Sequence, residues 1–339
     1  MYELRPEPAT IGGAIGVQSN GLRLFYRLGV YDALLERGST LSDVVMYSMK
    51  GNVLGVWDPV GWAKAKTGFG YIRIKRSDLL DVLMDAVYQA KIPVQFNKRI
   101  AAIEETEMGG RGGEGRVTVT FSDGTTDQAD LLLGCDGIHS DVRRLSVDSD
   151  LKPEYSGFSG LSSIISASEL TPSTVKQLSS GFCVTFTEEG MFAATPCTAS
   201  IDEVFWWFSK EVEIPRSGDS RDGWEVRRKE EVDGFKTSMF GILSSVCGDL
   251  GNTVREVVAK TKVVGFYPIY RLPLGRTWSR GRCLLIGDAA HAMQPHAGQG
   301  VSMALEDVFL LCRLLKDPKQ PLAEVFEEFN RIRRPRVDK

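Results

Sequence analysis

The stretch LLIGDAAHAMQPHAGQG, residues 284–300, brings several groups capable of binding chemistry into one short span. Its apolar start predicts a buried parallel strand that ends at Gly287 and Asp288, at the sheet edge where α/β proteins bind ligands. The Asp288 carboxylate can accept hydrogen bonds from ribose or ribityl hydroxyls. Gly298 and Gly300 have no Cβ, so a flat ligand can approach their backbone closely. The segment therefore predicts a site for a flat, hydroxyl-bearing ligand.

A helix is expected to follow from about Val301, in the sequence VSMALEDVFLLCRLL. The first N–H groups of a helix have no intrahelical partner, and this end of the helix dipole is positive. Such an end suits a ligand that gains negative charge. The alternative is a glycine-rich strand-to-helix turn that binds nothing. The combination of the Gly-Asp pair, Pro295 and the Gly-Gln-Gly string favours a ligand.

A second segment, LLLGCDGIHSDVRR at 131–144, repeats the pattern of an apolar strand that ends in Gly, Asp and Gly. A helix is expected to start at Ser140. Asp136 would then lie at a strand end in the same way as Asp288. The alternative is a turn residue whose carboxylate bonds its own backbone. The residues alone leave both possibilities open.

The chain begins with MYELRPEP, which predicts the end of a strand that carries Glu3. An acidic residue that ends the second strand of a dinucleotide-binding unit contacts ribose hydroxyls. A G-x-G-x-x-G turn should precede such a strand, but no α/β unit of this chain starts with one. The string GGRGGEG at 109–115 is expected to be the polar tip of a hairpin rather than a phosphate loop.

The elements that position these groups follow from apolar periodicity. Residues 153–270 hold short β-like runs such as GFCVTFTE and EVFWWFSKEV. A polar segment at 216–236 interrupts them and is expected to form a surface loop and helix. An α/β layer with an inserted strand-rich unit is therefore predicted. The expected helices are 20–38 and 77–90, and the expected hairpin with its following strand is 116–137.

Composition narrows the class of protein. The chain has 339 residues, is 42% hydrophobic and carries a formal net charge of -3. These values allow a sizeable core and argue against a nucleic-acid or anionic-membrane surface. The basic run RIRRPR, 331–336, is expected to be the solvated end of a surface helix. The chain has no apolar run of about 18 residues, so no membrane-spanning helix is expected. No signal-peptide segment is recognisable either.

The cysteines and histidines predict no metal site. Six cysteines are scattered without a C-x-x-C pair, and three histidines are too few for a zinc pattern. We expect buried, reduced thiols in a cytoplasmic protein.

Together these segments resemble the flavoprotein aromatic hydroxylases, FAD-dependent monooxygenases such as para-hydroxybenzoate and salicylate hydroxylases. They look closest to the fungal members of secondary-metabolite pathways. The resemblance covers essentially the whole chain. LLIGDAAHAMQPHAGQG resembles the family's segment for the FAD ribityl chain and ring, and CDGIHSDVR its second fingerprint, linked to FAD and NAD(P)H. IKRSDLLDVL resembles the start of a helix near the FAD diphosphate.

The resemblance implies a set of FAD-binding residues. Glu3 would bind the adenosine ribose, and Gly16 would lie in the loop against the cofactor. Arg76 would reach the diphosphate, as a guanidinium at a helix start can. The remaining implied positions are Asp288 at the ribityl chain, Val301 at the pyrimidine edge, Pro295 near flavin C4a, and Asp136, Gly298 and Gly300.

The implied fold is an α/β, Rossmann-like FAD-binding domain of the glutathione-reductase type with an inserted β-rich substrate domain. The FAD-binding domain would comprise residues 1–45, 75–152 and 270–339, and the substrate domain residues 46–74 and 153–269. The family normally begins with a further strand and a G-x-G-x-x-G turn. The FAD-binding domain is therefore expected to be incomplete at its N-terminus.

The implied reaction uses NAD(P)H to reduce FAD and transfers one atom of O2 to a small-molecule substrate. Hydroxylation or epoxidation of an aromatic, polyketide or prenylated compound in secondary metabolism is expected. The alternative is a truncated or degenerate, non-catalytic relative that does not hold FAD tightly. No side chain can be named as a general base. Tyr267, Tyr270 and Arg271 are candidates for substrate contact.

Overall fold

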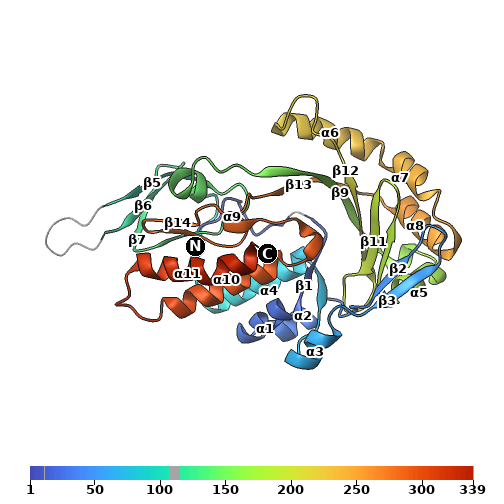
Figure 1. Cartoon of the computed structure of the whole chain (residues 1–339), viewed down its shortest axis with the longest axis horizontal. Helices are drawn as coiled ribbons and strands as arrows, with labels where there is room; N and C mark the ends of the chain where they lie inside the picture. The colour runs from blue at the N-terminus through green and yellow to red at the C-terminus, as the bar shows by residue number, and fades with distance from the viewer. Residues whose placement is uncertain (11, 107–114, 339) are drawn as a thin grey trace. The chain divides into compact units, whose positions relative to one another are not determined.

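The computed structural model describes residues 1–10, 12–106 and 115–338 (Figure 1). Most of the GGRGGEG string lies outside the described residues. Backbone contacts divide the chain into two compact units. Unit 1 comprises Met1–Ala9, Val87–Glu154 and Tyr270–Lys339, and unit 2 comprises Thr10–Ala86 and Tyr155–Ile269.

Unit 1 contains the short sheet that leads into the Gly-Asp segment. Its central strand, β15 (Cys283–Leu285), pairs in parallel with β8 (Leu132–Gly134) and antiparallel with β14 (Ser279–Arg280). All three residues of β15 are fully buried. The predicted buried parallel strand before Gly287 is therefore confirmed.

Two helices and a second sheet complete unit 1. The helices α10 (Gly300–Leu314) and α11 (Leu322–Val337) lie side by side (Figure 1). Their apolar residues share one core with β15, including Leu311 and Phe329. The second sheet is an antiparallel meander of β5 (Ile100–Glu105), β6 (Val117–Phe121) and β7 (Thr126–Ala129). The hairpin predicted within 116–137 is confirmed, but the buried strand expected after it, β8, is only partly buried because Leu133 is exposed.

Unit 2 is built on a seven-stranded sheet. Trp206 and Phe208 lie on one face of this sheet, in a core shared with the helices that cover it (Figure 1). The Trp206 Nε1–H donates to Thr261 Oγ1 at 3.0 Å, at the end of α8. The helices are α5 (Pro172–Leu178), α6 (Arg221–Asp233), α7 (Phe235–Leu243) and α8 (Gly248–Lys260). In sheet order the strands are β13 (Gly265–Arg271), β9 (Glu154–Ser166), β12 (Glu203–Glu211), β11 (Gly190–Pro196), β10 (Phe182–Phe186), β2 (Val44–Tyr47) and β3 (Val53–Trp57).

A separate antiparallel pair in unit 2 joins β1 (Ala14–Val17) to β4 (Ile72–Lys75). The helix α4 (Arg76–Gln89) begins directly after β4, close to the predicted 77–90. The single helix predicted over 20–38 is wrong. The segment forms α1 (Ser19–Arg27) and α2 (Tyr31–Leu35), with Gly29 between them at φ 76°, a conformation that ends a helix. A short α3 (Gly61–Thr67) follows β3.

The two units differ from the predicted domain segments mainly near the N-terminal half of unit 2. Residues 10–45 and 75–86 belong to unit 2 by backbone contacts, although the sequence places them in the FAD-binding domain. The division describes compactness only, and the assignment of a cofactor domain and a substrate domain stays a prediction.

Three general features complete the description. None of the helices in the described residues is long and apolar enough to cross a membrane. The same residues contain no cluster of three or more His, Cys, Asp or Glu that could hold a metal. All six cysteines are free, but the expectation that they are buried is wrong for Cys135, Cys247 and Cys312, which are exposed.

Candidate functional site

The turn at Gly287 sets the geometry of the first site segment. Gly287 has φ 59° and ψ -141°, a conformation that only glycine adopts readily. A Cβ at this position would also lie 3.2 Å from the Ala304 Cβ on α10. The chain therefore passes from β15 into α9 (Asp288–His291) tightly against α10.

Asp288 follows this turn and is exposed. Its Oδ1 lies 3.9 Å from the place where a Cβ at Gly300 would stand, so the carboxylate lies beside the start of α10. Within the described chain, no hydrogen bond or ion pair engages the Asp288 carboxylate. Its oxygens are therefore available to accept hydrogen bonds from a ligand.

The start of α10 offers N–H donors next to Asp288. The helix begins at Gly300, one residue before the predicted Val301, and among the described residues no side chain caps it. Gly298 ends the short turn Pro295–Ala297 in a left-handed conformation, and Pro295 is exposed. The structure thus brings Asp288, Gly298, Gly300 and Val301 together within one strand-turn-helix segment.

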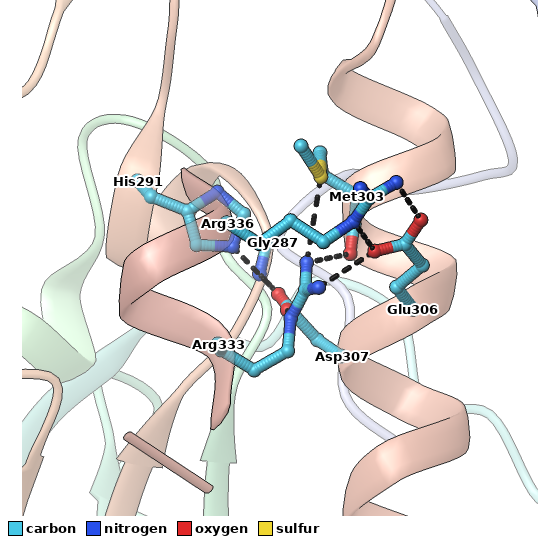
Figure 2. A network of polar contacts seen from close by, with 7 residues as sticks. All are labelled: Gly287, His291, Met303, Glu306, Asp307, Arg333 and Arg336. Carbon is cyan, nitrogen blue, oxygen red and sulfur yellow. Dashed lines mark hydrogen bonds and ion pairs between the residues drawn. The ribbon is translucent and has the colours of Figure 1, made fainter. Parts of the chain in front are cut away.

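A buried polar network holds the turn in place (Figure 2). Asp307 on α10 is fully buried. Its Oδ2 accepts the Gly287 N–H at 2.8 Å and lies 2.7 Å from Nε2 of the buried His291. Its Oδ1 accepts from Nε of Arg333 on α11 at 2.6 Å. One carboxylate therefore fixes the turn, α9 and α11 relative to one another.

Glu306, the neighbour of Asp307, extends the network toward solvent. It accepts from Arg333 Nη1 and from Arg336 Nη2, both at 2.6 Å (Figure 2). Arg333 is only 3% exposed. The expectation of a solvated RIRRPR helix end is wrong for this residue, because Arg333 lies inward between α10 and α11 and is fully paired by the carboxylates.

The second site segment is a capped turn. The Asp136 Oδ2 accepts the N–H groups of Asp141 and Val142 at 2.7 and 3.1 Å. The Ser140 hydroxyl accepts the N–H of Arg143 at 2.9 Å, which confirms the predicted helix start at Ser140. The geometry of Asp136 therefore favours the alternative in which the carboxylate satisfies its own backbone.

Arg143 ties the second segment to the first. Its Nη1 donates to the Ala289 carbonyl of α9 at 2.8 Å, and its Nη2 donates to the Ile138 carbonyl. Burial lowers the pKa of Arg143, and the charges of Asp136 and Asp148 oppose that shift. This buried guanidinium links the two glycine-rich turns of unit 1, a role that the sequence did not reveal.

The strand predicted to end at Glu3 is absent from the described residues, which have only an isolated parallel bridge between Tyr2 and Gln95 beside Glu3. The backbone N–H of Glu3 donates to the Gln95 carbonyl at 2.9 Å. Its Oε1 accepts the N–H of Arg5 at 2.9 Å, which fixes the direction of the carboxylate. One oxygen of Glu3 is thus used locally.

Gly16 and Arg76 belong to unit 2. Gly16 is on β1, and a Cβ there would lie 2.6 Å from the Tyr71 hydroxyl, so no larger residue fits without moving that ring. Arg76 is exposed at the first residue of α4. Its side chain lies over Gly12, where a Cβ would be 3.3 Å from both Cδ and Nε. A guanidinium thus lies at the start of a helix, as predicted from IKRSDLLDVL.

The other candidates lie on β13 or at its end. Arg271 forms an exposed ion pair with Glu154 at 3.7 Å. The Tyr270 ring lies 6.2 Å from the His139 ring. Neither contact tests whether Tyr267, Tyr270 and Arg271 touch a substrate. Their role therefore stays a prediction.

The comparisons with known proteins agree on one family. The family described as "FAD binding domain" matches residues 5–244 and 271–338. A 6-hydroxynicotinate 3-monooxygenase from Pseudomonas fluorescens is 30% identical over 341 residues, which covers 98% of this chain and 81% of the relative. A salicylate hydroxylase from Pseudomonas putida is 27% identical, over 99% of this chain and 76% of the relative.

Solved structures show the same fold. A crystal structure of Klebsiella pneumoniae HpxO complexed with FAD and uric acid superposes with a TM-score of 0.80 at 22% identity. The superposition covers 99% of this chain and 78% of that chain.

Proposed function

Because this chain belongs to the FAD binding domain family and its relatives are FAD-dependent monooxygenases, we propose that it hydroxylates a small aromatic molecule with NAD(P)H and O2. The family resemblance recognised in the sequence is thereby confirmed. The observation that carries the proposal is the exposed, unengaged Asp288 carboxylate, held beside the start of α10 by a buried network.

The residues of unit 1 fit the ribityl chain and ring of FAD. Asp288 would accept hydrogen bonds from ribityl hydroxyls. The N–H groups at Gly300 and Val301 would face the pyrimidine edge, where the positive end of the helix favours negative charge. Pro295 and Gly298 would shape the adjoining backbone. Asp136 would act indirectly, through the turn that it caps.

The other FAD groups have candidate partners as well. Arg76 would bind the diphosphate, because a guanidinium pairs with phosphate oxygens in a planar fork. Gly16 would allow close approach of the cofactor to β1. Glu3 would bind the adenosine ribose through the oxygen that Arg5 does not occupy.

FAD, when bound, supplies the redox chemistry with NAD(P)H and O2. The chain's own contribution is to bind and orient the cofactor. The Asp307 network keeps the turn at Gly287 from moving, which fixes the direction of the Asp288 carboxylate. Preorganisation of this kind lowers the cost of ordering the site on binding.

Ring hydroxylation is favoured over epoxidation of a prenyl chain. The relatives above are named for 6-hydroxynicotinate and salicylate, both aromatic compounds. The resemblance to fungal members supports a setting in secondary metabolism. The competing possibility is a non-catalytic relative that holds FAD weakly.

The proposal is tested by mixing the purified protein with FAD and following NADH and NADPH oxidation. Hydroxylated aromatic acids, phenols and a prenylated quinolone serve as substrates, and isotopically labelled O2 identifies oxygen transfer. We expect substrate-stimulated oxidation and a product that carries one labelled oxygen atom. Weak FAD binding, with no stimulation of NAD(P)H oxidation by any substrate, would instead favour the non-catalytic relative.

A further inference from the structure

Arg73 on β4 is a cation surrounded by aromatic rings. Its guanidinium carbon lies 5.5 Å from the ring centre of Tyr71, 5.7 Å from that of Phe182 and 5.2 Å from that of Trp207. Phe182 and Trp207 stack on each other, with ring centres 5.0 Å apart. All four residues belong to unit 2. The aromatic faces stabilise the positive charge but do not neutralise it.

No anion in the described residues pairs with this cation. The Arg73 Nε is buried without a hydrogen-bond partner, although the guanidinium also meets the Tyr71 hydroxyl. Among the described residues, no Asp or Glu forms an ion pair with Arg73. Arg73 is half-buried, whereas Arg143 and Arg333 are buried. Arg333 pairs with two carboxylates, and Arg143, whose Nε also has no partner, donates to two carbonyls. A buried donor without an acceptor costs free energy, which a ligand can recover.

The position of Arg73 is fixed by its backbone. Arg73 lies opposite Gly16 in the β1–β4 register. On its other side, its N–H donates to the Ser39 carbonyl at 2.7 Å and its carbonyl accepts the Ser39 N–H at 2.8 Å. Because successive residues of a strand face opposite sides, Arg73 points away from the buried Ile72 and Ile74. The guanidinium is therefore held on a rigid element.

The aromatic partners come from the sheet face that the helices leave uncovered. Trp206 and Phe208 of β12 lie in the core with α5–α8, so Trp207 between them faces the other way. Ala14 of β1 packs on Phe205 of β12, which places β1 over this same face. A ligand here would meet stacked rings and a cation that no carboxylate of the described residues pairs.

Tyr71 completes the cluster with a donor. Burial raises the pKa of the Tyr71 hydroxyl, and the neighbouring Arg73 charge opposes that shift. The hydroxyl therefore stays protonated near neutral pH and can donate. It also lies against Gly16, the residue expected to contact the cofactor.

We propose that Arg73, with the Tyr71 hydroxyl, forms an anion-binding subsite that selects aromatic substrates carrying a carboxylate. The rings of Phe182 and Trp207 would stack on the substrate ring, and the guanidinium would bind the carboxylate through its planar fork. This inference rests on the proposed function, because it places the subsite next to Gly16. It makes Arg73 a specificity-determining residue.

The test measures binding, not turnover. Salicylate and 6-hydroxynicotinate are compared with the uncharged salicylamide and 6-hydroxynicotinamide by isothermal titration calorimetry on the full chain. A hydrogen-bonded charge pair predicts that each acid binds about tenfold to a hundredfold tighter than its amide. Arg73→Met should remove that preference while leaving amide binding nearly unchanged.

Two further variants control the result. Arg73→Gln keeps a polar side chain without the charge and should also lose the preference, which covers the case in which Arg73→Met does not fold. Arg228→Met removes an exposed arginine on α6 of the same unit and should keep the preference for the acid. Equal affinities for acid and amide in the unaltered protein overturn the proposal. So does a preference that survives the loss of Arg73, or a failure to bind either acid.

The experiments distinguish a failure of the subsite proposal from a failure of the proposed function. A protein that oxidises NAD(P)H with neutral aromatic substrates but does not prefer acids retains the monooxygenase function and lacks the subsite. A protein that binds the acids through Arg73 but never oxidises NAD(P)H retains the subsite and lacks the function.

Discussion

Two aspartates at matching strand ends have different surroundings. Asp136 and Asp288 each follow an apolar parallel strand and a glycine, so the sequence allows the same role for both but leaves Asp136 open. In the structure, Asp136 accepts two backbone N–H groups, whereas Asp288 is exposed and unengaged in the described chain. The difference comes from the turn that follows each strand, which periodicity does not specify.

These surroundings predict opposite effects of substitution. Asp288→Ala should lower FAD affinity about tenfold to a hundredfold, the equivalent of a lost charged hydrogen bond of roughly 1.5–3 kcal/mol, without lowering stability. Asp136→Ala should instead lower the free energy of unfolding by about 0.5–2 kcal/mol, as the loss of a helix cap does. Flavin titration and urea denaturation of both variants measure the two quantities. Unchanged FAD affinity in Asp288→Ala would remove Asp288 from the site.

Substitution of Arg76 tests the proposed contact between its guanidinium and the FAD diphosphate. Arg76→Lys keeps the charge but loses the planar fork that matches phosphate oxygens, so FAD should bind more weakly. Arg216→Lys, at an exposed arginine of the same unit, should leave the affinity unchanged. Both affinities are measured by quenching of flavin fluorescence. Equal affinities for the two variants would give Arg76 a structural role only.

At the scale of elements, the sequence predicts the segments in which apolar residues recur with a clear helical or strand periodicity. The buried β15, the helix after Gly300, the 116–137 hairpin and α4 all follow apolar repeats or turn residues. The break at Gly29 was missed because the apolar spacing continues across it. The partner of His291 was missed for a different reason. Asp307 and Arg333 lie on separate helices, and only the packing of α10 against α11 brings them together.

The Asp307 network predicts that one carboxylate stabilises several elements at once. Asp307→Ala leaves the buried Arg333 charge and the Gly287 N–H without that acceptor. Removing one partner of a buried ion pair costs roughly 3–5 kcal/mol. Glu306→Ala is the matched control, because Glu306 is the adjacent residue, also pairs with Arg333, and is more exposed, at 17% against 0% for the side chains.

Urea denaturation measures both free energies of unfolding. We expect the loss in Glu306→Ala to be about 1 kcal/mol or less, as for partly solvated pairs. Flavin affinity should fall in Asp307→Ala as well, because the turn before Asp288 loses its anchor. Equal losses of stability in the two variants would show that the burial of Asp307 does not increase its contribution to the free energy of unfolding.

At the scale of the whole molecule, each unit has its own hydrophobic core and is assembled from segments distant in sequence. Neither unit is a continuous stretch of chain, so the segments of each unit are brought together by tertiary contacts alone. The sequence predicted the inserted strand-rich part from its short β-like runs. It did not predict that residues 10–45 and 75–86 pack with that part, because such contacts depend on tertiary packing rather than on local periodicity.

Cofactor binding should therefore stabilise the whole chain by linkage. A ligand that binds only the folded state adds RT ln(1 + [L]/Kd), about 2.7 kcal/mol at a hundredfold excess over Kd. We expect FAD at that excess to raise the free energy of unfolding by this amount, measured by urea denaturation followed with far-UV circular dichroism. Riboflavin lacks the diphosphate and should stabilise less at the same concentration, because Arg76 then has no ligand group to bind.

The same measurement connects the residue scale to the whole chain. If Asp288→Ala weakens FAD tenfold to a hundredfold, the FAD concentration used above is only about one to ten times the new Kd. The stabilisation should then fall to about 0.4–1.4 kcal/mol. A variant that retains the full stabilisation contradicts the assignment of Asp288. An unaltered protein that gains no stability from FAD at any concentration supports the non-catalytic relative over the monooxygenase.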